Sequence, residues 1–296
     1  MFIKRRVLLF MKKYEMLPTE ENIIETLYND PINRNKDIVY FYNILQAQES
    51  ASAIAIDGRW GSGKTFFVRQ TKMVINALNP SSTIDEETKA KATVRLPFSK
   101  NDEENENYSI AVYYDAWEND NDTEPVLSLI YEITKQLSVD FSLSDISVVK
   151  TAGAIIEAIS GHNINGIKDA LTSEDPFKKF KEEKDVEQKI KDFFASILVE
   201  RGNRLIIFID ELDRCKPTFA VHLLEQIKHY IFDDRITFVF SINLEQLQHT
   251  IKQYYGADFD SCRYLDRFFD LRISMPPANM EKFYSEIAVS YTHLRA

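Results

Sequence analysis

The sequence predicts an α/β fold, either as one large domain or as a core domain that carries a helical insertion. Three observations support this prediction. The 296 residues can bury a substantial core without disulfides or metals. The continuous apolar run Leu205–Ile209 is typical of a strand that is buried on both faces. A second apolar run, Ala53–Ile56, leads through a glycine-rich turn into a helical pattern that extends to about Leu78.

The glycine-rich turn has the pattern G-x-x-x-x-G-K-[ST], a P-loop (Walker A), in the strand–turn–helix context that supports it. Its residues are Gly58, Arg59, Trp60, Gly61, Ser62, Gly63, Lys64 and Thr65. Glycines allow the backbone N–H groups to point at an anion, and the helix N-terminus adds donors. Lys64 is expected to reach the β- and γ-phosphates, and the Thr65 hydroxyl to ligate Mg²⁺. The turn is therefore predicted to bind a nucleoside triphosphate.

Composition narrows the functional classes. The net charge of −10 disfavours nucleic acid as a partner, because no global basic character attracts phosphates. Two cysteines, Cys215 and Cys262, fit a reduced compartment, and scattered histidines predict no metal cluster beyond a nucleotide-bound Mg²⁺. The apolar run after Lys4 is too short for a signal peptide, and no run is long enough to span a bilayer. We therefore expect a soluble, cytoplasmic protein without a membrane span.

Residues 1–36 are predicted to form an N-terminal helical extension. Its helix begins near Thr19, where acidic residues follow a capping side chain, and ends at the turn Asn29-Asp30-Pro31. The next segment, Asp37–Gln46, has apolar residues at helical spacing and is predicted to be an amphipathic helix that leads into the P-loop strand.

Residues 37–139 are predicted to be the first part of the core. After the P-loop helix, the polar chain is expected to contain a short strand at Ala92–Leu96 and an exposed acidic loop at Asn101–Asn107. Ser109–Tyr114 is predicted to be a strand, and Pro125 to begin an amphipathic helix.

Residues 140–202 are predicted to be the helical insertion. Ile146–Ile159 is apolar enough to be buried within it, and a membrane-surface or partner helix is the alternative. Phe177–Glu200 is strongly helical with an apolar stripe, and Gly202 is expected to cap its C-terminus.

Residues 203–288 are predicted to be the second part of the core. Its first strand ends in Asp210 and Glu211, as a Walker B strand does. An aspartate at that position holds Mg²⁺ in P-loop enzymes, and Glu211 is placed to orient or deprotonate a water. A structural acidic pair is the alternative interpretation.

The remaining elements follow in sequence. A helix is expected from Pro217 and a strand at Ile236–Phe240. Asn243 after that strand is either a sensor of the γ-phosphate or the cap of the next helix. The elements expected after it are the helix Leu244–Tyr255, a helical turn at Tyr264–Phe269, the strand Asp270–Ile273 and a helix from Met280. Residues 289–296 match no element and are predicted to be a non-native tail.

Four motifs in this order resemble the KAP family of P-loop NTPases. They are Gly58–Thr65, Asp115-Ala116-Trp117-Glu118, Asp210-Glu211-Leu212-Asp213-Arg214-Cys215 and Tyr264-Leu265-Asp266-Arg267-Phe268-Phe269. The resemblance implies a three-layer P-loop NTPase fold of the additional-strand, catalytic-glutamate class. Its central sheet is mostly parallel, and its Walker B strand is not adjacent to the P-loop strand. The resemblance also implies ATP as the nucleotide, and it links the chain to a family with members in phage exclusion and in membrane-associated signalling scaffolds.

The chain departs from the family pattern at three places. Many members carry transmembrane helices in the insertion, which here has a soluble pattern. Members often have Asp where this chain has Asn243, and Lys where it has Arg267. Arg267 and Arg214 are both candidates for an arginine finger, which needs a flexible cation that reaches the transition-state charge of its own site or of a neighbouring subunit's site. A surface or salt-bridging arginine is the alternative for each.

These observations predict an ATP-hydrolysing, Mg²⁺-dependent switch that acts on a protein partner or through self-association. Thr65 and Asp210 would hold the metal, Lys64 would stabilise phosphate charge, and Glu211 would activate water. Trp60 and Trp117 are expected to pack around the pocket or in the core. Two other classes stay open: a P-loop phosphotransferase, and a nucleotide-binding scaffold with negligible turnover. Preference for ATP over GTP follows from the resemblance, and the chain has no Asn-Lys-x-Asp motif that would read guanine.

Overall fold

The computed structural model describes residues 17–98, 108–141, 152, 155, 178–198, 202–230 and 233–277. Within these ranges, five strands form one all-parallel sheet in the order β2-β3-β4-β1-β5. The strands are β1 (Ser52–Asp57), β2 (Ser109–Asp115), β3 (Arg204–Asp210), β4 (Ile236–Ile242) and β5 (Leu271–Ser274). β4 lies between β1, which leads into the P-loop, and β3, the strand predicted to be the Walker B strand, so the predicted separation of these two strands is confirmed.

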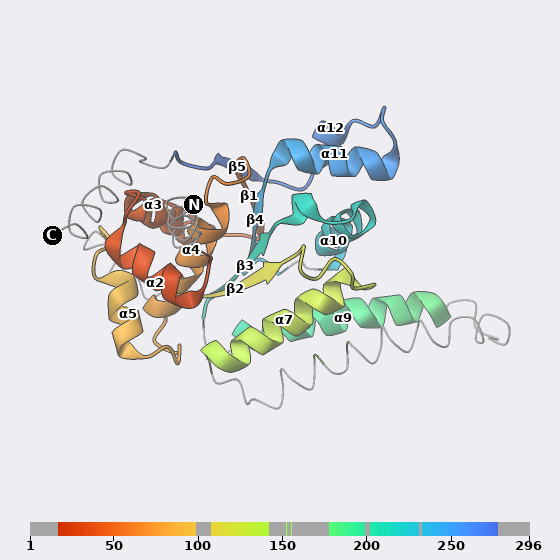
Figure 1. Ribbon diagram of the computed structural model, residues 1–296. Helices are drawn as coiled ribbons and strands as arrows, with labels where there is room; N and C mark the ends of the chain where they lie inside the picture. The colour runs from red at the N-terminus through yellow and green to blue at the C-terminus, as the bar shows by residue number, and fades with distance from the viewer. Residues whose placement is uncertain are drawn as a thin grey trace, which may run out of the picture.

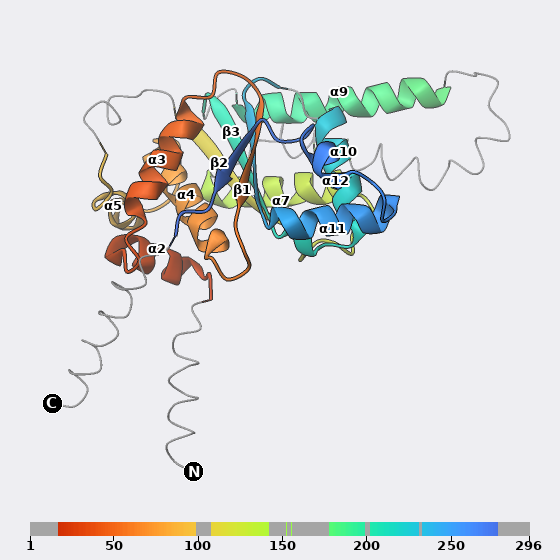
Figure 2. The same cartoon turned by 90° about the horizontal axis from the view of Figure 1, so that it is seen from above.

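Helices cover both faces of the sheet, so the predicted three-layer α/β fold is confirmed (Figures 1 and 2). Successive side chains of each strand point to opposite faces. On one face, Ile206 and Phe208 of β3 pack with the first four helices of the described chain. These are α2 (Glu20–Asn29), α3 (Asn35–Gln46), α4 (Lys64–Leu78) and α5 (Glu86–Thr93).

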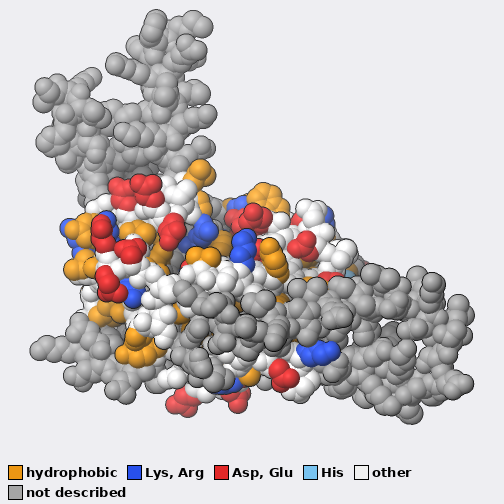
Figure 3. Space-filling view, turned by 90° about the horizontal axis from the view of Figure 1, so that it is seen from below, with side chains coloured by type: hydrophobic (Ala, Val, Ile, Leu, Met, Phe, Trp, Pro, Cys, Tyr) orange, Lys and Arg blue, Asp and Glu red, His pale blue; other side chains and the backbone are white. Residues whose placement is uncertain are grey.

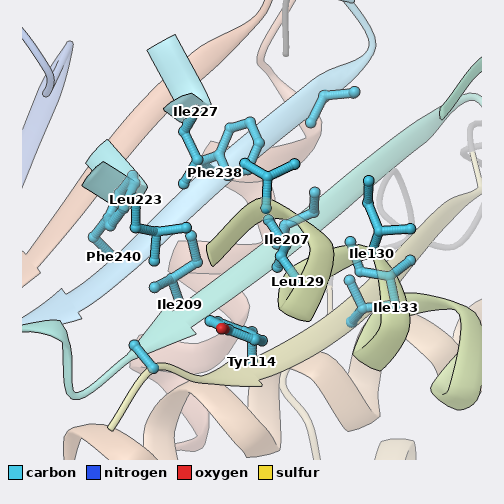
Figure 4. Close-up of a cluster of buried hydrophobic side chains, with 14 of the residues drawn as sticks. Tyr114, Leu129, Ile130, Ile133, Ile207, Ile209, Leu223, Ile227, Phe238 and Phe240 are labelled. Carbon is cyan, nitrogen blue, oxygen red and sulfur yellow. The ribbon is translucent and has the colours of Figure 1, made fainter. Parts of the chain in front are cut away.

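The opposite face carries the larger core. Ile207 and Ile209 of β3 lie there with Leu129 of α7 and Leu223 of α10 (Figure 4). The helices of this side are α7 (Pro125–Asp140), α9 (Lys178–Leu198), α10 (Pro217–Tyr230), α11 (Leu244–Tyr255) and α12 (Ser261–Leu265). A short 3₁₀ turn, η1 (Leu212–Arg214), joins β3 to α10. Since both faces of β3 are fully buried, its continuous apolar sequence is explained.

The two helices before β1 form as predicted. Thr19 caps α2 by accepting a hydrogen bond from the Asn22 N–H, and Asp30 ends the helix in the left-handed region at φ 46°. The Asp30 carboxylate then accepts a hydrogen bond from the Arg34 N–H at 2.6 Å. Helix α3 begins directly afterwards at Asn35, two residues earlier than the apolar spacing indicated.

The strand predicted at Ala92–Leu96 is wrong, because Glu86–Thr93 forms helix α5. Asp85 caps this helix by accepting from the Thr88 N–H at 2.9 Å. Acidic residues lie in the first turn and a lysine in the last, which suits the helix dipole. Capping by Asp85 stabilises a helix here, and so does the high helix propensity of alanine, lysine and glutamate. Together they outweigh the strand pattern of the apolar residues that follow.

The capping role predicted for Gly202 stays a prediction, because residues 199–201, which join it to α9, lie outside the described residues. A Cβ at Gly202 would lie 2.9 Å from the carbonyl oxygen of Tyr108. Close approach to the start of β2 is therefore what excludes a side chain at this position.

Several predicted segments lie outside the described residues: the acidic loop Asn101–Asn107, most of Ile146–Ile159, the helix from Met280 and the tail 289–296. None of the helices in the described ranges is long and apolar enough to cross a bilayer. On the face shown in Figure 3, acidic and basic side chains of the described residues lie interspersed.

Side-chain amides bind the outer edge of β2. Asn76 of α4 donates to the Ala111 carbonyl at 2.9 Å and accepts from the Ala111 N–H at 2.8 Å, as a neighbouring strand would. Alternate residues of a strand present their backbone groups on the same edge, so a series of amides can satisfy them. The pairs along this edge are Asn79 with Ser109, Asn76 with Ala111, and Gln136 with Tyr113.

We expect Asn76→Leu to lower the free energy of unfolding by about 2 to 4 kcal/mol, because two buried backbone groups of Ala111 would lose their partner. Urea unfolding followed by circular dichroism measures this loss. Asn43→Leu, at an exposed position of the neighbouring α3, is the matched control and should change stability by less than about 0.5 kcal/mol. Equal stability of the two variants would contradict a role for the Asn76 amide.

Candidate functional site

A pocket of about 430 Å³ opens at the carboxyl ends of the strands. Strands β1, β2 and β3 each end there in an aspartate, and Asp115 lies opposite Asp210 in the register of β2 and β3. Ligands of open parallel sheets bind at this edge. The lining residues are Pro18, Trp60, Gly61, Gly63, Lys64, Thr65, Phe66, Arg69, Tyr113, Asp115, Glu118, Asp210, Glu211, Asp213 and Arg214.

The P-loop needs glycine at three positions, two of them because of the backbone conformation and one because of close packing. Gly61 and Gly63 have φ of 78° and 83°, a region that residues with a Cβ rarely adopt. Gly58 leaves β1 beside Met275, where an added Cβ would lie 2.8 Å from the Met275 Cβ. Gly58, Arg59 and Ser62 shape the loop without lining the pocket, and Gly63 is the residue from which α4 begins.

We expect Gly63→Ala to weaken nucleotide binding about tenfold more than Gly61→Ala does. Both substitutions carry the left-handed penalty of about 1 to 2 kcal/mol. Only at position 63 would the new Cβ also lie 2.9 Å from Nη1 of Arg34, so that either the loop or the Arg34 guanidinium, which donates to the Ser62 and Pro276 carbonyls, must shift. Titration with a fluorescent ATP analogue compares the two variants, and equal affinities would contradict a constraint from Arg34.

The ammonium group of Lys64 lies in the pocket at the start of α4. Its Nζ donates to the carbonyl oxygens of Gly58, at 2.5 Å, and Arg59, at 3.3 Å. Burial lowers the pKa of Lys64, and the carboxylates of Asp213 and Asp210 oppose that effect. The lysine is thus held by the loop it belongs to, within reach of an anion at the helix N-terminus.

Asp210 is the most buried acid of the pocket, at 1% exposure. Its Oδ2 accepts from the Tyr113 hydroxyl at 3.1 Å, and its Oδ1 accepts from the Glu211 N–H at 3.0 Å. Burial raises the pKa of Tyr113, which keeps that hydroxyl a donor. Hydroxyl and carboxylate oxygens are the ligands that Mg²⁺ prefers, so the donor set of Thr65 and Asp210 fits this ion.

Glu211 follows directly in a strained backbone conformation, with φ 59° and ψ 22°. Its Oε2 accepts from Nη1 of Arg214 at 3.0 Å. Burial raises the pKa of Glu211, and the Arg214 guanidinium opposes the rise. The turn directs this carboxylate into the pocket, where a carboxylate can accept a proton from water.

Two predicted site residues lie elsewhere. Asn243 caps α11 by accepting from the Gln246 N–H at 3.3 Å, which is the structural alternative considered for it, and it does not line the pocket. Arg267 lines a separate cavity of about 150 Å³ with Ala51 and Ser52, at the amino end of β1. The turn after α12 thus places Arg267 at the amino ends of the strands, whereas Arg214 lines the P-loop pocket at their carboxyl ends.

Several residues of this region were not predicted as site residues. Besides Tyr113, they include three that carry a charge. Asp213, also in the pocket, accepts a hydrogen bond from the Trp60 indole at 2.7 Å. Arg69, whose guanidinium lies 4.7 Å from the Tyr113 ring, follows Thr65 by four residues in α4, and this helical spacing could have indicated it. The third residue is Arg34.

Arg34 is buried behind the P-loop. Its Nη2 donates to the carbonyl oxygens of Ser62 and Pro276, both at 2.9 Å. These partners lie 28 and 242 residues away in the sequence, so no local pattern could indicate the contact.

A family model described as the KAP family P-loop domain matches residues 34–294. No curated protein matches the chain. The matched region includes the P-loop, every strand described above, and the pocket residues from Trp60 to Arg214. The chain therefore belongs to the KAP family of P-loop NTPases.

Proposed function

We propose that the chain binds and hydrolyses Mg²⁺–ATP and uses the cycle as a conformational switch. The observation that supports this most directly is the convergence of Lys64, Thr65, Asp210 and Glu211 on one pocket, although they come from opposite sides of β4 in the sheet. Such a set can bind a triphosphate, hold a divalent ion and accept a proton from water.

Each side chain has a defined part in the proposed reaction. Lys64 and the P-loop N–H groups stabilise negative charge on the β- and γ-phosphates. Thr65 and Asp210 would hold Mg²⁺, which, when bound, neutralises charge on the phosphate oxygens. Glu211 orients a water and takes its proton. The hydrogen bonds from the Tyr113 hydroxyl and the Glu211 N–H fix the orientation of the Asp210 carboxylate. Each carboxylate oxygen keeps a further lone pair with which it could bind Mg²⁺.

Phosphate release from Mg²⁺–ATP by the purified chain tests the proposal. We expect turnover that stops when Mg²⁺ is chelated, and a slower reaction with Mg²⁺–GTP. Tight nucleotide binding without phosphate release would favour a scaffold, whereas transfer of phosphate to an added acceptor without release would favour a phosphotransferase. Absence of nucleotide binding would contradict the proposal as a whole.

Contacts around Arg34 support a switch, since they connect the P-loop to the segment that follows β5. One guanidinium nitrogen donates to Ser62 in the loop and to Pro276 after β5. The Met275 N–H also donates to the Asp57 carbonyl at 2.7 Å. A movement of the loop on nucleotide binding would therefore displace the chain that leaves β5. A protein partner or a second copy that binds there, in phage exclusion or in signalling, would sense the nucleotide.

A further inference from the structure

The chain contains two tryptophans, and both lie beside one arginine. The Arg214 guanidinium carbon is 5.7 Å from the ring centre of Trp60 and 5.4 Å from that of Trp117, within the range of cation–π attraction. Trp60 belongs to the P-loop and Trp117 to the turn after β2. About half of the surface of each of these residues is exposed, at 54% and 51%, so core packing does not explain either one.

The same guanidinium holds the carboxylate of Glu211 at 3.0 Å. The turn that carries both residues is fixed on its other side, because Asp213 accepts from the Trp60 indole and its carbonyl accepts from the Thr250 hydroxyl of α11. Glu211 is thus held by a side chain that is itself held by the P-loop and by the turn after β2.

Nucleotide binding must change this arrangement at the P-loop. The Lys64 ammonium now donates to the Gly58 and Arg59 carbonyls, and it has to turn from them to reach a phosphate. Trp60 follows Arg59 directly in the loop, so a shift there changes the ring against which Arg214 lies.

We infer that Arg214 is a positioning residue, which transmits the state of the P-loop through Trp60 to the carboxylate of Glu211, with Trp117 as its second support. This inference rests on the proposed hydrolytic function. It differs from an arginine finger, because Arg214 acts on Glu211 rather than on the phosphates.

Tryptophan emission provides a direct test. In Trp60→Phe the aromatic ring at position 60 is kept, although its hydrogen bond to Asp213 is lost, and Trp117 becomes the single tryptophan of the chain. Trp117 itself does not line the pocket, although Asp115 and Glu118 near it do, and we expect Mg²⁺–ATP to shift its emission mainly through Arg214. Adding Arg214→Gln should remove the shift, while a competition assay with a fluorescent ATP analogue shows that nucleotide is still bound. No shift despite binding, or a shift that persists without Arg214, would overturn the inference.

Kinetics provide the second test. We expect Arg214→Gln and Trp117→Leu to lower kcat about 10- to 100-fold with little change in KM, since both misplace Glu211 without touching the bound phosphates. Arg214→Lys should restore part of the rate, because it keeps the charge but not the planar fork. Arg95→Gln is the matched control: Arg95 lies 3.9 Å from the Tyr28 ring, a cation–π pair outside the pocket.

The outcomes separate this inference from the proposed function. A normal kcat in Trp117→Leu beside a large loss in Arg214→Gln would identify an arginine that acts on the phosphates directly, and would overturn the inference. If the wild-type chain binds Mg²⁺–ATP without turnover, the hydrolytic proposal fails, and the emission of Trp117 alone decides the coupling. If no nucleotide binds, both proposals fail.

Discussion

Replacing Glu211 with glutamine is expected to lower the turnover of Mg²⁺–ATP by about 10²- to 10⁴-fold and to leave nucleotide affinity largely unchanged. The amide is nearly isosteric with the carboxylate and can still accept the hydrogen bond from Arg214. It cannot take a proton from water. The substitution therefore removes one chemical capacity while the pocket keeps its shape, so phosphate release and nucleotide binding should separate.

A coupled assay of phosphate release, beside equilibrium binding of a fluorescent ATP analogue, measures both quantities. Glu132→Gln on α7 is the control, since Glu132 forms a surface ion pair with Lys135 and does not line the pocket. Near-normal turnover by Glu211→Gln would assign proton transfer to another acid of the pocket, with Asp115 and Glu118 as the next residues to test.

Lys64→Ala is expected to weaken Mg²⁺–ATP binding about 10²- to 10⁴-fold, because charge-assisted hydrogen bonds to two phosphates contribute roughly 1.5 to 3 kcal/mol each. The pocket also holds the carboxylates of Asp115, Glu118, Asp210, Glu211 and Asp213, and without the lysine they would repel a triphosphate more strongly. Turnover at moderate nucleotide concentration should fall below detection.

Lys72→Ala is the matched control for this loss. Lys72 lies on the same helix and forms an ion pair with Asp140 at 2.8 Å, outside the pocket. It should bind nucleotide as the wild-type chain does. An affinity in Lys64→Ala that equals the control would mean that the triphosphate is held by other groups, and it would remove the central argument for the site.

Patterns within one element predicted most of the fold and the centre of the site. The run Leu205–Ile209 is apolar at every position because both faces of β3 are buried, and Thr19 caps α2 through a contact only three residues away. The P-loop combines strand, turn and helix within one short segment, so its sequence alone indicated where Lys64 and Thr65 would lie.

Contacts between distant segments could not be predicted in this way. The spacing of Arg34 and Pro276 along the chain gives no sign that they meet behind the P-loop. Arg267 was weighed as an arginine finger from its motif, but the fold places it at the amino end of β1, away from the P-loop pocket of its own chain. Action on a neighbouring subunit's site stays a prediction. The error at Ala92–Leu96 had a local cause, because the capping by Asp85 outweighed a short apolar pattern.

The amide pairs along β2 have a consequence for how this molecule opens. Edge strands normally exchange their amide hydrogens early and offer a template for pairing with other chains. Here the N–H groups of Ala111 and Tyr113 are bound by side chains of α4 and α7. Their exchange should therefore be as slow as that of the central strands, and β2 should become available for aggregation only when the helices of both layers have come away from the sheet.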